Sequence, residues 1–333
     1  MRELSISVYF ARAVLKHAVA MDVDVVALLR KNRISPRLLQ EDNAKISIER
    51  FADLQVSTMI AMQDEALGYS SRRMPIGTWT MMCHAVIGSE TLGQALHRYC
   101  RFFQLFEFGA RPYLEVSEDC AHIVVKPFDE STALRGFFGE TVLFNTHRFA
   151  SWLVQELLPI QAVQLRGPAL ADLGDYRRMF LAYPTQFEQA ETRLTLSRAL
   201  LEKRVTQNEQ TLQHFLRHPV LIMLSQSYSQ NSWTARVKNI IRHDLACMPE
   251  LNEVATRLDI HPQTLRRRLS GEGANFKELK NQLRRDTALH FLGKQGLSIE
   301  EIAYRAGFSE PSAFIRAFKG WTGITPYTYR KGL

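Results

Sequence analysis

The segment that decides the fold is IEEIAYRAGFSEPSAFIRAFK at residues 299–319. Its first apolar residues recur at the i, i+3, i+4, i+7 spacing of one helical face, and the same spacing occurs about 48 positions earlier, over residues 251–258. A tight turn with one apolar residue follows each face, Ile260 in the first copy and Phe308 in the second, and a short basic helix comes next. The repeat predicts two helix-turn-helix units.

Local signals place the ends of these helices. Residues 298–301, Ser-Ile-Glu-Glu, have the form of a capping box, which satisfies two backbone donors at a helix start. Gly307 can adopt the left-handed conformation that ends a helix, whereas Asp259, at the equivalent place in the first copy, tolerates it less well. Pro262 suits the first turn of the helix that follows.

The second helix of each unit carries the candidate DNA-binding residues. Leu265 and Leu269 should face the core in the first copy, as should Phe314 and Phe318 in the second. The residues expected to contact DNA are Gln263, Thr264, Arg266, Arg267, Arg268, Ser312, Ile315, Arg316 and Lys319. Arginine can make a bidentate contact to guanine and glutamine to adenine in the major groove. A solvated basic helix face is the alternative for residues 266–268, and the position of this triplet in a repeated helix-turn-helix favours DNA.

Positive charge is concentrated in the last third of the chain. From residue 230 onward there are 17 Lys and Arg against 10 Asp and Glu, and the totals of 42 and 34 leave 25 against 24 for residues 1–229. A basic balance within one small domain is typical of nucleic-acid binding, although a solvated basic surface has the same composition.

The polar stretch SQSYSQNS at residues 225–232 separates the neutral part from the basic part. The 333 residues and 46% hydrophobic content suffice for two domains. We expect a regulatory domain over residues 1–225, a linker over 226–233 and a DNA-binding domain over 234–333. Its helix-turn-helix units should occupy 251–270 and 298–320, joined by a helix of about 17 residues at 276–292.

The first part has the pattern of a mostly helical α+β domain. Helical spacing covers residues 4–30, 48–66, 91–106 and 137–157, with Thr91 as an N-cap. Alternating runs at 113–116, 122–125 and 163–165 predict strands of a small sheet. The expected fold is therefore this α+β domain followed by an all-α domain with two helix-turn-helix units joined by a long helix.

At these residues the chain resembles the AraC/XylS family of bacterial transcription regulators. The resemblance rests on the ordered motifs Ile-Ala, Gly-Phe, Phe-x-Arg-x-Phe-Lys, Gly, Thr-Pro and Tyr-Arg between residues 302 and 330, and it covers about residues 234–331. It implies that the two recognition helices enter successive major-groove segments on one face of DNA. The positions carried over are Gln263, Arg266, Arg267, Ser312, Ile315 and Arg316. His261 departs from the family, in which Ser or Thr usually caps the helix.

The first part is similar to the effector-binding domain of regulators related to ornithine- and arginine-responsive activators. The matching features are the region from Gly77 to Cys83, residues 91–96 (TLGQAL), Tyr183 and Pro184 before Phe187, and residues 193–196 (RLTL) before Leu200 and Leu201. The resemblance covers about 200 residues and leaves the ligand-binding residues unassigned.

Other residue groups support neither an enzyme nor a metal site. The pairs His214 and His218, His97 and Cys100, and His243 and Cys247 each lack a third ligand at metal-site spacing. There is no G-x-G-x-x-G, P-loop or G-x-S-x-G motif, so we expect no cofactor and no catalysis. The four cysteines, Cys83, Cys100, Cys120 and Cys247, are widely spaced and should be reduced thiols.

Two groups in the first part keep alternative interpretations. The phenylalanines at positions 102, 103, 106, 108, 137, 138 and 144 line an apolar effector pocket or, more commonly for such stripes, form core. Arg72, Arg73 and Arg135 grip a carboxylate of an effector or belong to a solvated surface.

The combined expectation is a cytoplasmic, sequence-specific transcription regulator, an activator controlled by a small-molecule effector. Its expected partners are promoter DNA, RNA polymerase and a second copy of the chain. No signal peptide and no apolar run of about 20 residues are present, so we expect no membrane association. The alternative is that the first part is a dimerisation or protein-interaction module without a ligand, with a helix over residues 200–224 as its interface.

Overall fold

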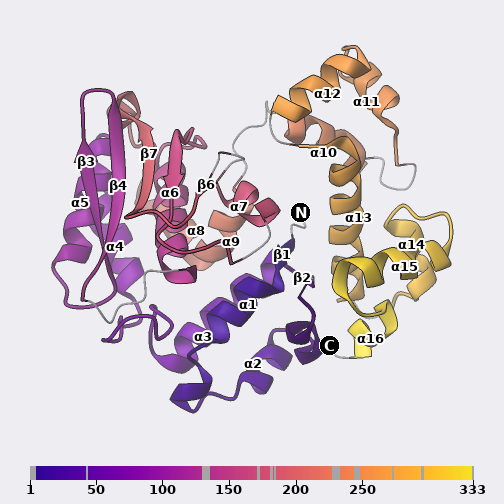
Figure 1. The fold of residues 1–333 in the computed structure, drawn as a ribbon, viewed down its shortest axis with the longest axis horizontal. Helices are drawn as coiled ribbons and strands as arrows, with labels where there is room; N and C mark the ends of the chain where they lie inside the picture. The colour runs from indigo at the N-terminus through magenta and orange to yellow at the C-terminus, as the bar shows by residue number, and fades with distance from the viewer. Residues whose placement is uncertain are drawn as a thin grey trace. The chain divides into compact units, whose positions relative to one another are not determined.

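The computed structural model describes residues 5–42, 44–129, 136–170, 173–180, 183, 185–226, 233–243, 248–271, 274–293 and 296–331. The chain forms two units, whose helices and strands are labelled in Figure 1. One unit comprises residues 1–12, 26–54 and 229–333, and the other comprises residues 13–25 and 55–228. The residues at the start of the chain therefore group with the basic part, which the sequence pattern did not predict.

The unit that contains the basic part begins with a small sheet. Strand β1 (Ser5–Ser7) pairs antiparallel with β2 (Lys45–Ser47), and Ile6 lies opposite Ile46. Helices α1 (Val8–Leu15) and α3 (Ile48–Met62) follow these strands and each extends into the other unit. Between them come α2 (Val25–Lys31) and a 3-10 helix, η2 (Pro36–Gln40). The expectation of helix throughout residues 4–30 was thus wrong at β1, because this strand is stabilised by a partner about 40 positions away.

The rest of this unit is helical. Its helices are α10 (Trp233–His243), α11 (Leu251–Arg257), α12 (Pro262–Gly271), α13 (Phe276–Leu292), α14 (Ile299–Arg305), α15 (Pro311–Thr322) and α16 (Pro326–Lys331). Helix α13 has the bounds expected for the connecting helix. The proposed linker lies mostly outside the described residues, and α10 begins at Trp233, its last position.

The other unit combines helices with a five-stranded sheet. Its helices are η1 (Val19–Met21), α4 (Thr78–Ile87), α5 (Leu92–Gln104), α6 (Phe137–Leu153), α7 (Leu173–Met179), η3 (Arg198–Glu202), α8 (Glu209–Arg217) and α9 (Pro219–Ser225). Its strands are β3 (Ala110–Val116), β4 (Cys120–Pro127), β5 (Ala162–Gln164), β6 (Thr185–Gln186) and β7 (Thr192–Ser197), arranged in the order β3-β4-β7-β5-β6. All neighbours are antiparallel except β5 and β6. The expected strands and helix starts are confirmed, including Thr91, which accepts a hydrogen bond from the Gln94 amide.

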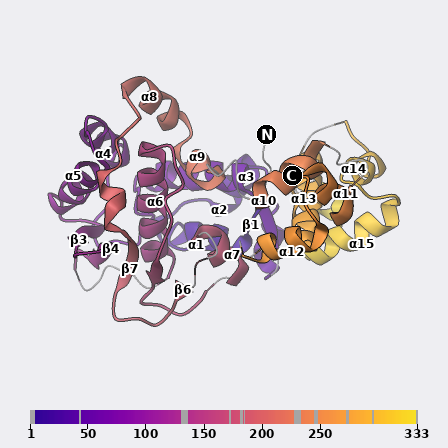
Figure 2. The ribbon, with the colours of Figure 1, turned by 90° about the horizontal axis from the view of Figure 1, so that it is seen from above.

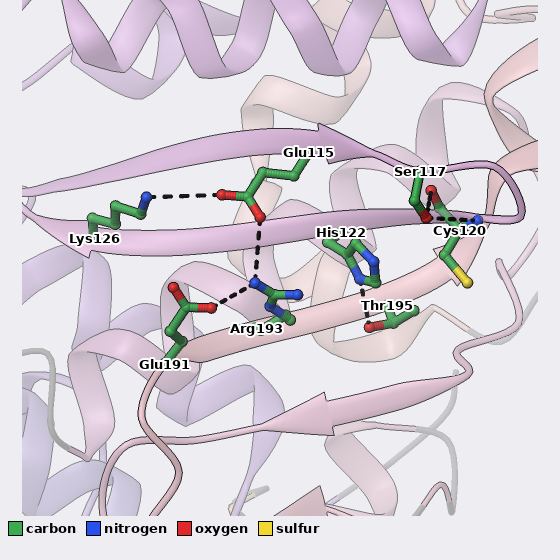
Figure 3. Close-up of polar contacts among 8 residues, drawn as sticks. All are labelled: Glu115, Ser117, Cys120, His122, Lys126, Glu191, Arg193 and Thr195. Carbon is green, nitrogen blue, oxygen red and sulfur yellow. Dashed lines mark hydrogen bonds and ion pairs between the residues drawn. The ribbon is translucent and has the colours of Figure 1, made fainter.

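The two faces of the sheet differ in polarity. Ile123, Leu194 and Leu196 are buried on one face, and α6 packs against β4 and β7 (Figure 2). The opposite face carries charged side chains, as Figure 3 shows. Glu115 pairs there with Lys126 at 3.8 Å and with Arg193 at 3.3 Å. The charges of this face therefore largely neutralise one another.

The helix expected over residues 200–224 is wrong as a single element. It is divided into η3, α8 and α9, because Asn208 caps the start of α8 and Pro219 begins α9. Leu212 and Phe215 are fully buried within the unit. A continuous exposed interface helix is therefore absent from this stretch.

The remaining expectations for this unit have mixed outcomes. Cys83 and Cys100 are buried free thiols, and burial raises the pKa of Cys100 to about 12; Cys247 lies outside the described residues. Phe102, Phe106 and Phe108 contact one another, whereas Phe137 and Phe138 contact Tyr69. Arg72 pairs with Glu107 at 2.6 Å and Arg73 is exposed, while Arg135 and Pro184 lie outside the described residues.

Two searches of the described residues bear on membranes and metals. Within the described ranges, no helix is long and apolar enough to cross a membrane. The same part of the chain holds no group of three His, Cys, Asp or Glu side chains arranged to bind a metal ion.

Candidate nucleic-acid interface

The first helix-turn-helix unit is held by an aliphatic core. Leu265 and Leu269 of α12 are 0% and 1% exposed, as the sequence spacing predicts. They belong to one buried cluster with side chains from α10, α11 and α13, namely Val237, Ile241, Met248, Leu251, Val254, Ala255, Leu279 and Leu283. This packing fixes the rotation of α12 about its axis, so that Gln263, Arg266 and Arg267 are exposed.

The turn of the first unit is built without glycine. Asp259 adopts a left-handed conformation, with φ of 53°, and the Ile260 amide donates to the Ala255 carbonyl at 3.1 Å. Nδ1 of His261 accepts a hydrogen bond from the Gln263 amide at 3.2 Å. His261 thus performs the capping role that Ser or Thr usually has, because its ring nitrogen reaches an otherwise unpaired donor of the first turn.

Not every candidate on α12 faces away from the protein equally. The guanidinium of Arg268 lies over the ring of Trp233, 4.1 Å from its centroid, and Arg236 lies at 4.3 Å from the same centroid. Such cation–π contacts contribute about 0.5–2 kcal/mol. Thr264 is half-buried. The geometry therefore separates Gln263, Arg266 and Arg267 from Arg268, which packs on α10.

The second unit has an aromatic core. Phe314 and Phe318 of α15 are both fully buried, and their rings lie 5.7 Å apart. Phe308 contacts Phe314 at 5.5 Å, and Tyr329 of α16 contacts Phe318 at 5.5 Å. The candidates Ser312, Arg316 and Lys319 are exposed and Ile315 is half-buried.

The ends of the first helix of this unit follow the sequence signals. Ser298 and Glu301 form the predicted capping box, with the Ser298 amide donating to Glu301 Oε2 at 2.7 Å and the Glu301 amide donating to Ser298 Oγ at 3.0 Å. These hydrogen bonds lower the pKa of Glu301. Gly307 has φ of 77°, the left-handed conformation predicted for it.

Helix α13 supports both units through two basic side chains one helical turn apart. The Lys280 ammonium donates to the Met248 carbonyl at 3.1 Å and to Glu250 Oε1 at 2.7 Å, at the start of α11. The Arg284 guanidinium donates to the Gly307 carbonyl at 3.0 Å and lies over the Phe308 ring at 4.9 Å. Burial lowers the pKa of Arg284. Sequence reasoning missed both residues, and the i, i+4 spacing of two basic residues inside an apolar helix was the available signal.

The second unit also contacts the N-terminal segment of the same unit. Arg50 of α3 donates to the Tyr329 hydroxyl at 3.0 Å and to the Arg33 carbonyl at 2.8 Å. Arg285 of α13 donates to Ser5 Oγ at 3.0 Å. No local pattern predicts these contacts, because their partners are about 280 positions apart.

Two exposed recognition helices on one scaffold helix agree with the family matches. Residues 254–332 match a helix-turn-helix domain, and residues 23–205 match the family described as the N-terminal arabinose-binding domain of AraC transcription regulator. The chain belongs to the AraC family of transcription regulators. This AraC-family protein therefore binds DNA through its C-terminal helix-turn-helix domain and carries an effector-binding type of N-terminal domain.

Named relatives are regulators as well, and none of those described here is an enzyme. The ornithine utilization regulator of Pseudomonas aeruginosa is 25% identical over 327 residues, which cover 98% of this chain and 96% of the relative. VirS of Mycobacterium tuberculosis is 43% identical over 77 residues, 23% of each chain. The transcriptional activator CfaD of Escherichia coli is 34% identical over 107 residues, 31% of this chain and 40% of CfaD.

Proposed function

We propose that this AraC-family protein activates transcription from its target promoters when a small-molecule effector binds its N-terminal domain. The observation that carries the proposal is the pair of recognition helices, α12 and α15, which present exposed polar and basic side chains from two separately packed cores. The full-length similarity to a regulator named for ornithine utilization supports control by a metabolite. The activator CfaD among the relatives supports activation.

Each recognition helix has a distinct set of candidate base contacts. On α12 these are Gln263, Arg266 and Arg267, and on α15 they are Ser312, Arg316 and Lys319, with Ile315 available for a thymine methyl group. Arg268 is proposed to stabilise α12 through Trp233 and to contact phosphate at most. RNA polymerase and a second copy of the chain complete the proposed partners, in the cytoplasm where promoter DNA lies.

The DNA-binding proposal is tested with the full-length protein and a random DNA library. We expect selection to enrich two short motifs about one helical turn apart, because two recognition helices read one face of the duplex. Binding should weaken with salt, with log K falling by about 0.9 per phosphate neutralised for each tenfold rise in salt. Equal binding to all sequences at moderate salt would contradict the proposal.

The effector proposal is tested by thermal shift of the full-length protein with amino acids, fatty acids and small aromatic metabolites. A saturable rise in melting temperature supports an effector, since a ligand that binds only the folded state stabilises it. Strong dimerisation without any ligand response supports the alternative, an N-terminal interaction module without a small-molecule ligand.

A further inference from the structure

A buried carboxylate lies in the sheet-containing unit at the start of α6. Glu140 is only 2% exposed, and its Oε1 accepts a hydrogen bond from the Tyr176 hydroxyl at 2.9 Å. Its second oxygen, Oε2, is buried and has no hydrogen-bond partner within the described residues. A buried polar atom without a partner costs about 1–3 kcal/mol, and a charged one costs more.

Aromatic side chains surround this carboxylate. Tyr69 is close enough that the charge of Glu140, together with burial, raises the pKa of Tyr69. The Tyr69 ring lies 5.5 Å from that of Phe137 and 5.8 Å from that of Phe138, and its hydroxyl donates to the Ala13 carbonyl. The Tyr176 ring lies 4.8 Å from that of Phe187. Aromatic faces beside a carboxylate form the surroundings that favour an organic cation.

The protein supplies no cation to Oε2 from the same helix. The guanidinium of Arg148, the arginine of α6, lies over the Phe144 ring and donates to the carbonyls of Met179 and Gln226. Burial raises the pKa of Glu140 to about 7. The carboxylate is therefore held near neutrality, where an incoming positive charge would favour the ionised form.

We propose that Glu140 anchors the ammonium group of the effector, so that the effector is a small primary amine such as a diamine or a basic amino acid. The inference rests on the proposed effector control of this domain. An ammonium group fits better than a guanidinium group because Tyr176 already occupies Oε1. A single available oxygen can accept one N–H bond but cannot receive the two parallel bonds of the guanidinium fork.

The test uses the full-length protein with 1,4-diaminobutane and ornithine as ammonium probes. Agmatine and arginine are the guanidinium counterparts, and pentanoate is the probe without a cation. Calorimetry should show saturable binding of an ammonium probe and about tenfold weaker binding of its guanidinium counterpart. Glu140→Gln keeps the size of the side chain and an oxygen acceptor for Tyr176, and it should weaken ammonium binding about tenfold or more. Glu118→Gln, at an exposed position of the same unit, should leave binding unchanged.

A second variant keeps the inference testable if Glu140→Gln folds poorly. Tyr176→Phe removes the hydroxyl from Oε1 and should bring the affinity of the guanidinium probes up to that of the ammonium probes. Unchanged amine binding in Glu140→Gln would overturn the inference. A wild-type protein that responds to fatty acids or aromatic metabolites but to no amine would overturn it and leave effector control intact. A protein that responds to no compound at all would overturn both.

Discussion

The two helix-turn-helix units share an architecture but are built from different side chains. The first unit buries Leu265 and Leu269 in an aliphatic core, whereas the second buries Phe314 and Phe318 among further aromatic rings. The turn of the first unit places an aspartate at φ of 53°, and the turn of the second places a glycine at φ of 77°. One backbone arrangement can thus be reached through different packing and with different local strain.

The two units also differ in what holds them. Lys280 of α13 ties the start of the first unit, and Arg284 ties the turn of the second. The second unit has an additional bond from Tyr329 to Arg50 in the N-terminal segment. The comparison teaches that the second unit is structurally connected to the beginning of the chain, and that the first depends on its own core and on α13.

The largest expected effect comes from removing a core side chain from each unit. Phe314→Ala should destabilise the second unit by about 3–5 kcal/mol, and Leu265→Ala the first by about 2–5 kcal/mol, through lost burial and the cavity left behind. Hydrogen exchange of the full-length protein should show each loss within its own unit, in α14–α16 or in α11–α12. Equal loss of protection in both units after either change would show that they unfold together and would remove the distinction.

The next effect concerns DNA reading by the two helices. Arg267→Ala and Arg316→Ala should each cost about 1–3 kcal/mol at the base that the side chain contacts, at positions about one helical turn apart. Binding-site selection with each variant measures which position loses its preference. Arg268→Ala is the matched control, since its side chain packs on Trp233 and should change the selected sequence little. Uniform weakening on all sequences would instead assign Arg267 and Arg316 to phosphate.

The turns provide a third comparison. Gly307→Ala should destabilise the second unit by about 1–2 kcal/mol, because a side chain disfavours the left-handed conformation. Asp259→Gly should give the first unit the turn residue of the second and change its stability by at most about 1 kcal/mol, since strain relief is opposed by the entropy of glycine. Urea unfolding followed by hydrogen exchange measures both. A neutral Gly307→Ala variant would refute the role of glycine there.

A smaller effect tests the tie to the N-terminal segment. Tyr329→Phe removes the hydroxyl that accepts from Arg50 and should cost about 0.5–1.5 kcal/mol. Hydrogen exchange should increase in α16 and at the start of α3 together. Tyr327→Phe is the control, because this tyrosine of the same helix is 56% exposed. If the two variants behave alike, the bond contributes nothing measurable to the second unit.

The smallest effect concerns pH and the capping box of the second unit. Glu301 has a lowered pKa in the folded protein, so its stabilising contribution is present above the unfolded pKa and is lost as pH falls through the folded value. Carbon NMR of the Glu301 carboxyl should show a midpoint below the model-peptide value of about 4.3. Ser298→Ala should move this midpoint upward. An unchanged midpoint would assign the lowered pKa to other groups.

Much of the helix-turn-helix domain could be predicted because its contacts are local in sequence. The spacing of Leu265 and Leu269, and of Phe314 and Phe318, correctly assigns the buried positions of each recognition helix. The cap at Ser298 and the turn at Gly307 are confirmed because both depend on backbone hydrogen bonds within a few residues. The helix expected over residues 200–224 failed because the N-cap at Asn208 and the proline at 219 outweighed a continuous apolar pattern.

The candidate site shows the same boundary between local and distant information. The exposed positions on α12 and α15 follow from helical periodicity, yet the cation–π contact of Arg268 required knowing where Trp233 lies. Glu140 gave no sequence signal, because a single glutamate in a helix is normally solvated and its burial depends on Tyr176 of another helix.

By itself, the sequence determined the duplicated helix-turn-helix, its inward and outward faces and the family to which the chain belongs. Helical periodicity, caps and turns act over a few residues, so a linear pattern contains them. Only the tertiary structure decided that β1 and α3 join the DNA-binding unit, that Arg50 meets Tyr329, and that Glu140 is buried with one unpartnered oxygen. These features depend on packing between segments far apart in the chain, where burial and hydrogen bonding are set by neighbours that no local pattern names.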